Sequence, residues 1–296
     1  MATQPWSLVQ YQDSPGGELR AGVEAEGVVY ALPEGFAPTT IEILRSWRRS
    51  EAALRALEVS DLAEVPAARL GAPITFPPKI LCAGANYYDH AAEMGTAVPD
   101  PTARPFFFLK PPTTTVIGPD AGIPMPSGVD AGLDWEVELG VVIADRVKNV
   151  TEADALAHVA GYLVANDISA RGIFPRPDAV MAPFAWDWFL HKALDGFCPT
   201  GPGLVPSWFV PDPADLAISL SVNGVMKQQS STGNLVIGIA RLISEASRFV
   251  TLEPGDLILT GTPAGVGMPR KDFLSIGDHM VAEIEGLGSL RTTVVA

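Results

Sequence analysis

Residues 133–146, LDWEVELGVVIADR, carry the most strand-like pattern in the sequence and, within it, two closely spaced negative charges. Successive side chains of a strand point to opposite faces, so Glu136 and Glu138 share one face while the apolar side chain between them points to the other. Like charges this close repel each other. A strand that keeps both glutamates therefore indicates either a face open to water or a bound cation.

The same spacing occurs at Glu24/Glu26 and at Glu283/Glu285, so spacing alone does not identify a site. Both of those pairs lie beside glycine turns, which favours a solvated strand face. The central pair differs because a third acid, Asp167, follows another apolar run. Three carboxylates among apolar strands would raise each other's pKa unless a cation compensated, and Mg²⁺ or Mn²⁺ with oxygen ligands is the natural partner. On this pattern a metal site and a solvated face both stay open.

Composition limits the class of protein. The chain has 296 residues, and its 20 Lys+Arg against 34 Asp+Glu give a net charge of −14, which argues against nucleic acid as a partner. Cys82 and Cys198 are the only cysteines, and they form no disulfide framework. The N-terminus lacks a signal-peptide pattern, and no apolar run is long enough to cross a bilayer. We expect a cytoplasmic protein with no membrane partner.

The chain divides into two predicted units near a proline-rich stretch. Residues 1–75 read as a small N-terminal α/β domain, with short strands around a helix at 39–59. Residues 76–296 are dominated by strands. The helices predicted there, at 151–163 and 235–250, are too few for a βαβ alternation. The predicted fold class is therefore α+β, mainly β, with mostly antiparallel pairing.

Two local signals support this assignment. Asn223-Gly224 between alternating apolar residues is typical of a two-residue hairpin. Thr151, with Asp154 three residues later, forms a helix-capping pattern.

His90 and Glu93 lie three residues apart in NYYDHAAEMG, residues 86–95. In a helix these positions share a face, so the carboxylate can orient the imidazole and stabilise its protonated form. His90 is then a candidate general base that activates water. The alternative is an ordinary His–Glu contact on a helix surface.

Lys192 and the turn around Thr262 are the remaining candidates. Lys192 is flanked by apolar residues, which predicts partial burial near an anion; a solvated lysine is the alternative. Residues 259–267, LTGTPAGVG, lack the G-K-[ST] ending of a phosphate-binding P-loop. This turn can instead offer backbone N–H groups and the Thr262 hydroxyl to an anion.

Taken together, five ordered motifs resemble the fumarylacetoacetate hydrolase family, from about residue 79 to the C-terminus. They are CAGANYYDHAAEMG, DWEVELGVVIADR, GYLVANDISAR, KALDGFCPTGPGLV and LEPGDLILTGTPAGVG. The resemblance implies a mixed β-roll, resembling a β-sandwich, as the C-terminal catalytic domain, and it implies a homodimer. It also implies a divalent metal, Mg²⁺ or Mn²⁺ with Ca²⁺ as a further option, bound by Glu136, Glu138 and Asp167.

The resemblance also implies an activity. Family members act on small 2-oxo or 2,4-dioxo carboxylates, so we expect a metal-dependent hydrolase that cleaves a C–C bond of an acylpyruvate. Lys192 would stabilise developing negative charge, Arg171 and Thr262 would help bind substrate, and His90, oriented by Glu93, would deprotonate water. An oxaloacetate-type decarboxylase, an isomerase or hydratase of unsaturated 2-hydroxy acids, and a non-catalytic metal-stabilised binding dimer stay open.

The sequence departs from the family pattern in the predicted substrate pocket. After SAR, Gly172 and Phe174 stand where many members have an acidic residue and a glutamine, and Ala193 replaces a common serine. These changes make one side of the pocket less polar. They leave the identity of the substrate open.

Overall fold

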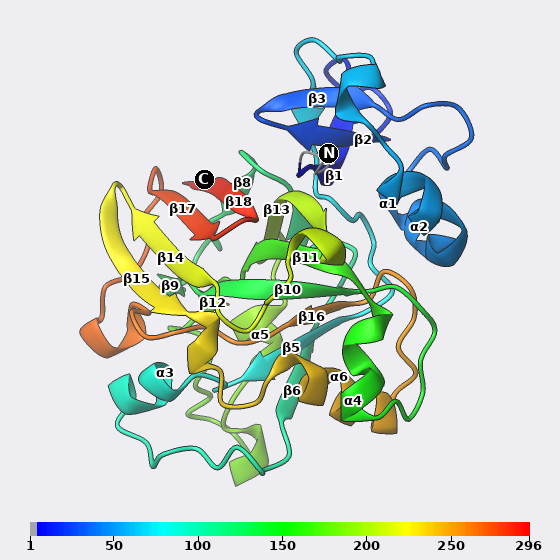
Figure 1. The fold of residues 1–296 in the computed structure, drawn as a ribbon. Helices are drawn as coiled ribbons and strands as arrows, with labels where there is room; N and C mark the ends of the chain where they lie inside the picture. Colours follow the sequence, from blue (N-terminus) through cyan, green and yellow to red (C-terminus); the bar gives the residue numbers. More distant parts are fainter. Residues whose placement is uncertain (1–4) are drawn as a thin grey trace.

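The computed structural model describes residues 5–296, and an eleven-stranded sheet runs through it (Figure 1). Its main path, in spatial order, is β3 (Val28–Ala31), β2 (Arg20–Ala25), β1 (Ser7–Gln12), β13 (Cys198–Pro206), β11 (Val159–Asn166), β10 (Val137–Ile143), β16 (Leu257–Leu259), β5 (Ile80–Gly84) and β6 (Phe106–Lys110). Two short strands branch from this path, β4 (Arg69–Leu70) on β1 and β7 (Val116–Ile117) on β13.

A five-stranded sheet packs against this one. Its order is β15 (Val225–Ser231), β14 (Ala217–Val222), β17 (His279–Ile284), β18 (Gly288–Val295) and β8 (Gly122–Pro124), and a two-stranded sheet joins β12 (Ser169–Ala170) to β9 (Leu133–Asp134). The helices are α1 (Thr40–Arg45), α2 (Trp47–Arg55), α3 (Tyr88–Glu93), α4 (Glu152–Ala155), α5 (Trp188–Lys192) and α6 (Ile239–Phe249). Short 3₁₀ turns are η1 (Val59–Asp61), η2 (Leu156–His158), η3 (Ala182–Phe184), η4 (Ser207–Phe209), η5 (Thr232–Asn234) and η6 (Met268–Arg270).

The prediction of an α+β fold that is mainly β, with mostly antiparallel pairing, is confirmed. Parallel pairs occur only at β7/β13, β5/β16 and β8/β18 within the described residues. The hairpin also forms where predicted: Asn223 and Gly224 have φ of 50° and 77° between β14 and β15, as a two-residue turn requires.

The central pair, β10 and β11, places the acidic residues. Every residue of both strands is buried, as their continuous apolar sequences predict. They pair antiparallel, with Val137 opposite Asn166. Glu136 therefore precedes one strand at the point where Asp167 follows the other, and the Asp167 N–H donates to the Glu136 carbonyl at 2.8 Å.

The two faces of β10 meet different layers. Val137, Leu139 and Val141 belong to an apolar cluster shared with Ile218 and Leu220 of the small sheet. The other face, which carries Glu138, faces away from that sheet, because alternate residues point in opposite directions. Both acidic side chains of the pair are thus kept out of the main apolar layer.

The N-terminal segment continues the long sheet. β1 pairs with β13, with Leu8 opposite Leu204. At the helical side of this segment, shown in blue in Figure 1, Arg48 of α2 donates from Nε to Asp145 Oδ1 at 2.9 Å. The boundary at residue 75, between units 1–75 and 76–296, stays a prediction.

Two predicted helices differ from the observed ones. The helix expected over 39–59 is interrupted at Ser46, whose ψ of 26° separates α1 from α2. The helix expected over 151–163 ends at His158, although Thr151 caps it as predicted by accepting from the Asp154 N–H. Beyond it the apolar residues from Val159 pair with β10 as a strand, and this pairing outweighs the helical pattern.

Within residues 5–296, none of the helices has the length and apolar character needed to span a membrane.

We predict that Leu139→Ala lowers the free energy of unfolding by about 2–5 kcal/mol, because Leu139 is fully buried at the centre of β10. Denaturant unfolding of the purified protein measures this change. Leu156→Ala is the matched control: Leu156 is 45% exposed, so the expected change is about 0.5 kcal/mol or less. Equal losses for the two variants would contradict the central position of β10.

Candidate metal centre and surrounding pocket

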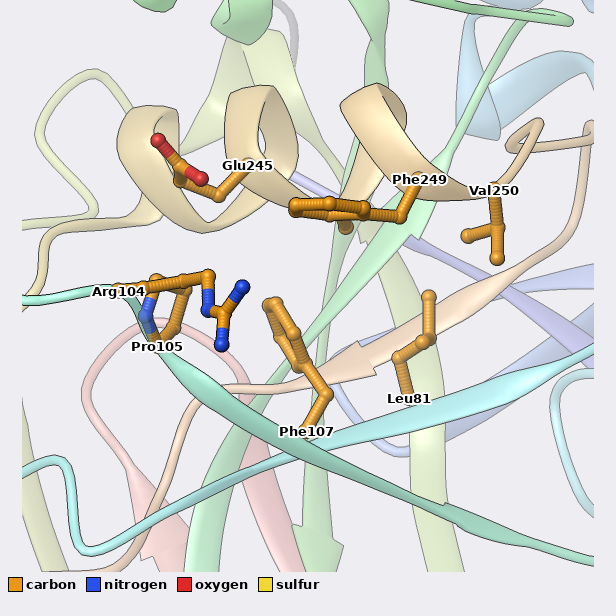
Figure 2. Close-up of a pocket in the computed structure, with 8 residues that line it drawn as sticks. Leu81, Arg104, Pro105, Phe107, Glu245, Phe249 and Val250 are labelled. Atoms are coloured by element: carbon orange, nitrogen blue, oxygen red, sulfur yellow. The ribbon is translucent and has the colours of Figure 1, made fainter.

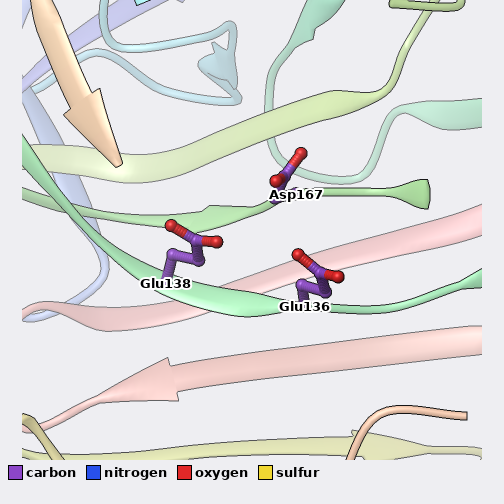
Figure 3. Close-up of side chains that lie close together, drawn as sticks. All are labelled: Glu136, Glu138 and Asp167. Atoms are coloured by element: carbon purple, nitrogen blue, oxygen red, sulfur yellow. The ribbon is translucent and has the colours of Figure 1, made fainter. Parts of the chain in front are cut away.

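Glu136, Glu138 and Asp167 form one buried carboxylate cluster (Figure 3). One oxygen from each lies within 4.8 Å of the others, and the residues are only 7%, 2% and 1% exposed. Figure 3 shows both glutamates pointing from their strand toward Asp167. The solvated face that the spacing left open is therefore excluded for this pair. Three buried hard oxygen ligands are a donor set that fits Mg²⁺ or Mn²⁺.

Lysine and arginine side chains compensate two of the three carboxylates. Lys192 Nζ lies 2.8 Å from Glu136 Oε2 and 2.7 Å from Asp167 Oδ2, and Lys110 Nζ lies 2.5 Å from Asp167 Oδ1. Arg171 pairs with Glu136. Burial alone would raise the pKa of Glu136, but Lys192 and Arg171 outweigh it and hold that pKa below its usual value.

Glu138 is the carboxylate of the cluster that pairs with no lysine or arginine among the described residues. Its Oε2 accepts from the Gly261 N–H at 2.6 Å, and no ion pair forms with it anywhere in residues 5–296. Burial, together with Asp167 and Glu136, raises the pKa of Glu138 well above its usual value. A divalent cation at the cluster would supply the missing positive charge, so these residues fit a metal site.

Lys192 is buried near anions, as its apolar neighbours in the sequence predicted, and is not a solvated lysine. It is the last residue of α5, is 3% exposed, and its Nζ lies 5.3 Å from the centre of the Phe108 ring. Burial acts to lower the pKa of Lys192, but Asp167 and Glu136 outweigh burial and raise it. Lys192 is therefore a charged ammonium group placed between two carboxylates.

Arg171 is held by residues that the sequence interpretation missed. Asp134 Oδ2 accepts from Arg171 Nε at 3.0 Å, and Asp134 also accepts from the N–H groups of Gly267 and Met268 at 2.6 and 3.1 Å. His191 Nε2 lies 3.3 Å from Arg171 Nη1. The only sequence signals were the position of Asp134 before Trp-Glu and that of His191 beside Lys192.

His191 is neutral in this arrangement. Burial, with Lys192 and Arg171 nearby, lowers the pKa of His191 to about 2. Its Nδ1 lies 3.2 Å from the Ala170 carbonyl, so the partners assign the proton to Nδ1 and leave Nε2 to accept from Arg171. His191 thus fixes the direction of the guanidinium group.

Lys110 is a third missed residue. It is 1% exposed at the end of β6, and besides Asp167 it donates to the carbonyls of Lys192 and Ile168 at 2.6 and 3.1 Å. It therefore joins the acidic cluster to the end of α5. In the sequence it follows three phenylalanines and a leucine and gives no signal of this role.

His90 and Glu93 lie on the predicted helix, α3. His90 Nδ1 is buried, has no hydrogen-bond partner among the described residues, and lies 3.6 Å from Glu93 Oε2. Glu93 is engaged elsewhere, because it accepts from the Gly265 N–H and from Arg270 Nη1, each at 3.0 Å. The pair is close and shares a face, and a small shift would complete a direct hydrogen bond.

The Thr262 turn binds carboxylates that belong to the protein itself. Its N–H groups at Gly261, Ala264, Gly265 and Gly267 donate to Glu138, Asp89, Glu93 and Asp134. The Thr262 hydroxyl donates to the Val137 carbonyl at 2.9 Å and accepts from Gln228 Nε2 at 2.8 Å. The turn thus fixes the acidic residues around the cavity.

A cavity of about 170 Å³ brings the predicted residues together. Its walls include every predicted site residue except Glu93: His90, Glu136, Glu138, Asp167, Arg171, Lys192 and Thr262. Phe108, Trp188 and His191 also line it. The cavity therefore combines an acidic cluster and two cations with an aromatic wall.

The departures at Gly172 and Phe174 have structural reasons. A Cβ at Gly172 would lie 2.1 Å from the Asp130 carbonyl oxygen, so the backbone leaves no room for a side chain. Phe174 stacks on His191, with ring centres 4.1 Å apart and planes at 20°. The aromatic wall of the cavity thus continues behind His191, the partner of Arg171.

A second, more apolar pocket of about 270 Å³ is separate from this cavity (Figure 2). It lies between α6 and strands β5 and β6, with Phe107, Leu81 and Phe249 as walls. Arg104 and Glu245 also line it. It contains none of the acidic cluster.

The comparisons with known proteins identify the family of the chain. The model for the fumarylacetoacetate (FAA) hydrolase C-terminal region matches residues 79–295. The chain belongs to the fumarylacetoacetate hydrolase family. The predicted family is therefore confirmed.

Relatives in the family carry the names of different enzymes. The chain is 41% identical over 297 residues to the mitochondrial oxaloacetate tautomerase FAHD2B of Bos taurus, covering 97% of this chain and 91% of the relative. A fumarylacetoacetate hydrolase structure from Exiguobacterium antarcticum gives a TM-score of 0.81 at 33% identity, covering 98% and 99% of the two chains. Maleylpyruvate hydrolase from Sphingobium sp. SYK-6, in complex with manganese(II) and pyruvate, gives 0.76 at 28% identity, covering 98% of each. The predicted family fold is thus confirmed.

We predict that Glu136→Gln weakens Mn²⁺ binding by more than about 100-fold, because even residues that only support metal ligands typically contribute 10–100-fold. Titration calorimetry on chelator-stripped protein measures the affinity. Glu283→Gln is the matched control, since Glu283 has the same Glu-x-Glu spacing on an exposed strand face. Undiminished Mn²⁺ affinity in Glu136→Gln would exclude the cluster as the metal site.

Proposed function

We propose that this protein is a metal-dependent hydrolase that cleaves a C–C bond in an acylpyruvate-type 2,4-dioxo acid. The observation that carries the proposal is the buried cluster of Glu136, Glu138 and Asp167 beside Lys192, in a cavity that His90 also lines. The maleylpyruvate hydrolase relative, bound to manganese(II) and pyruvate, supports it, because pyruvate is the fragment that such a cleavage releases.

Glu136, Glu138 and Asp167 would hold the metal, Mg²⁺ or Mn²⁺ with Ca²⁺ as a further option. When bound, the metal supplies Lewis acidity that stabilises negative charge on the 2-oxo group. Lys192 offers N–H donors to a substrate oxygen on which charge develops. Arg171, which Asp134 and His191 hold at the cavity wall, would bind the substrate carboxylate.

His90 is the proposed base. It takes a proton from water, and the resulting hydroxide adds to the carbonyl carbon of the acyl group. The C–C bond then breaks, and its electron pair leaves on the pyruvate fragment as an enolate. A proton then returns to the enolate carbon from which the acyl group was cleaved. Glu93, with Oε2 at 3.6 Å from His90 Nδ1, stabilises the protonated imidazole. Trp188 and Phe108 line the cavity and would reduce the access of other water to it.

A second candidate function is the tautomerisation of oxaloacetate. The similarity to the Bos taurus oxaloacetate tautomerase over nearly the whole chain favours it. This reaction moves a proton between carbon and oxygen without breaking a C–C bond, so His90 and Lys192 would suffice as proton-handling groups. The decarboxylase, the isomerase or hydratase, and the non-catalytic binding dimer are the further alternatives.

We also propose a cytoplasmic homodimer. Both cysteines are unpaired and buried, in keeping with a reducing compartment, although the Bos taurus relative is mitochondrial by name. β6 lies at the end of the long sheet, and its surroundings expose apolar side chains: Phe106 is 52%, Leu109 60% and Phe189 65% exposed. Such a patch on a sheet edge is suited to a second copy.

We expect the metal-restored protein to consume an acylpyruvate and release pyruvate, while the chelator-stripped protein does not. The ultraviolet absorbance of the enolised diketo group and a coupled pyruvate assay measure this across a panel of acyl groups, with oxaloacetate included. Oxaloacetate interconversion without pyruvate release would favour the tautomerase. Metal-dependent pyruvate release from oxaloacetate would favour the decarboxylase.

Two variants connect that activity to the cavity. His90→Ala should lower kcat by about 100-fold or more, in the range of a lost general base, with Mn²⁺ affinity unchanged. His279→Ala is the control, because His279 lies on an exposed strand position of β17. Full activity of His90→Ala would remove His90 from the mechanism.

We expect a dimer in sedimentation equilibrium, and we expect Leu109→Glu to shift it toward monomer by placing a charge on the apolar patch. Met226→Glu is the matched control, because Met226 is 52% exposed on β15. A dimer unaffected by Leu109→Glu would place the interface elsewhere.

A further inference from the structure

Arg270 makes three contacts that join α3 to the turn beside the metal cluster. Its Nη1 donates to Glu93 Oε1 at 3.0 Å. Its Nη2 donates to the carbonyls of Gly265 and Val266, each at 2.7 Å. We propose that Arg270 is a positioning residue that sets the place of Glu93, and through it the place of His90, over the cavity.

The geometry of the guanidinium group is essential to this role. Arginine is a rigid planar fork that can hold a carboxylate with one nitrogen and carbonyl groups with the other. The second oxygen of Glu93, Oε2, accepts from the Gly265 N–H at 3.0 Å. Glu93 is thus fixed at both oxygens by one short segment, 265–270, and this leaves its carboxylate 3.6 Å from His90 Nδ1.

The rest of α3 rests on the same turn. Asp89 Oδ1 accepts from the Ala264 N–H at 3.3 Å, and Asp89 Oδ2 accepts from the Ser230 hydroxyl at 2.5 Å. Asp89 therefore holds the first turn of α3, and Glu93 holds the last. Because α3 has six residues, too short to be stable alone, its position depends on its surroundings, and these two contacts are its anchors on the turn.

Burial explains why Arg270 matters more than an ordinary surface arginine. Its own side chain is 46% exposed, whereas Glu93 is 15% and His90 14% exposed. Without Arg270 the Glu93 carboxylate would remain mostly buried with only the Gly265 N–H as a fixed donor. A partly buried carboxylate that loses its cation is destabilised where it lies, and this favours a shift toward water. Such a movement would carry α3 and His90 away from the cavity.

The catalytic consequence rests on the proposed function, because it requires His90 to act on substrate. The positional consequence does not, since the packing of α3 can be measured without substrate. We therefore test both, using Arg270→Met, Arg270→Lys and Lys271→Gln. Lys271 is the matched control: it is the next residue, it is exposed, and its side chain forms no hydrogen bond or ion pair with the described part of the chain.

The first measurement is amide hydrogen exchange of the peptide that covers α3 in the metal-loaded protein. We expect exchange to rise by roughly tenfold in Arg270→Met, as local opening becomes easier, and to stay unchanged in Lys271→Gln. Arg270→Lys should recover part of the protection, because an ammonium can still pair with Glu93. Unchanged exchange in Arg270→Met would overturn the proposal, whatever the protein's reaction.

The second measurement is steady-state kinetics with a double-mutant cycle. Arg270→Met should lower kcat by roughly tenfold or more at saturating Mn²⁺, since small misplacement of a reacting group is costly. In a Glu93→Gln background the same substitution should have a clearly smaller effect, because Glu93 is the shared partner. Equal effects in both backgrounds would show that Arg270 acts independently of Glu93 and only supports the turn, which would contradict the positioning role. If exchange responds but no substrate turns over, the proposed function fails and the positioning role stands.

Discussion

The antiparallel register of β10 and β11 is the constraint on which the site depends. Glu136 and Asp167 are separated by thirty residues of sequence but become neighbours because Val137 pairs with Asn166. A slip of one residue would turn Glu138 into the apolar layer that faces the small sheet. The register is secured beyond the ladder itself, since Asn166 Oδ1 accepts from the Glu136 N–H at 2.9 Å. The chemistry of the cavity is thus specified by strand pairing and apolar burial.

Burying three carboxylates together is costly, and the surrounding structure offsets that cost with cations from three separate segments. Lys110 ends β6, Arg171 follows β12, and Lys192 ends α5. Two of the three have further partners: Lys110 donates to backbone carbonyls, and Arg171 is held by Asp134 and His191. The result is a polar network in which a charge removed from one member leaves another unpaired. Such a network is stable only when the segments that carry its members are folded together.

The sequence predicted the parts of the site that depend on local order. Alternation along one strand placed Glu136 with Glu138, and helical spacing placed His90 near Glu93. It did not reveal Lys110, whose importance arises from β6 folding beside α5. The fold class could be predicted for the same reason, because the apolar pattern of a single strand is local. The length of the helix expected over 151–163 was overestimated. The last apolar residues of this segment fit the periodicity of a helix and that of a strand, and only pairing with β10 decides between the two.

The turn at residues 261–268 has a thermodynamic consequence. One end of it donates to Glu138 through Gly261, while its middle donates to Asp89 and Glu93 of α3. A ligand that draws Glu138 toward itself acts on the same short backbone that anchors α3. Occupancy of the acidic cluster and the order of the helix over it are therefore linked quantities. By reciprocity, the factor by which occupancy of the cluster favours the docked helix is the factor by which docking of the helix raises the affinity of the cluster.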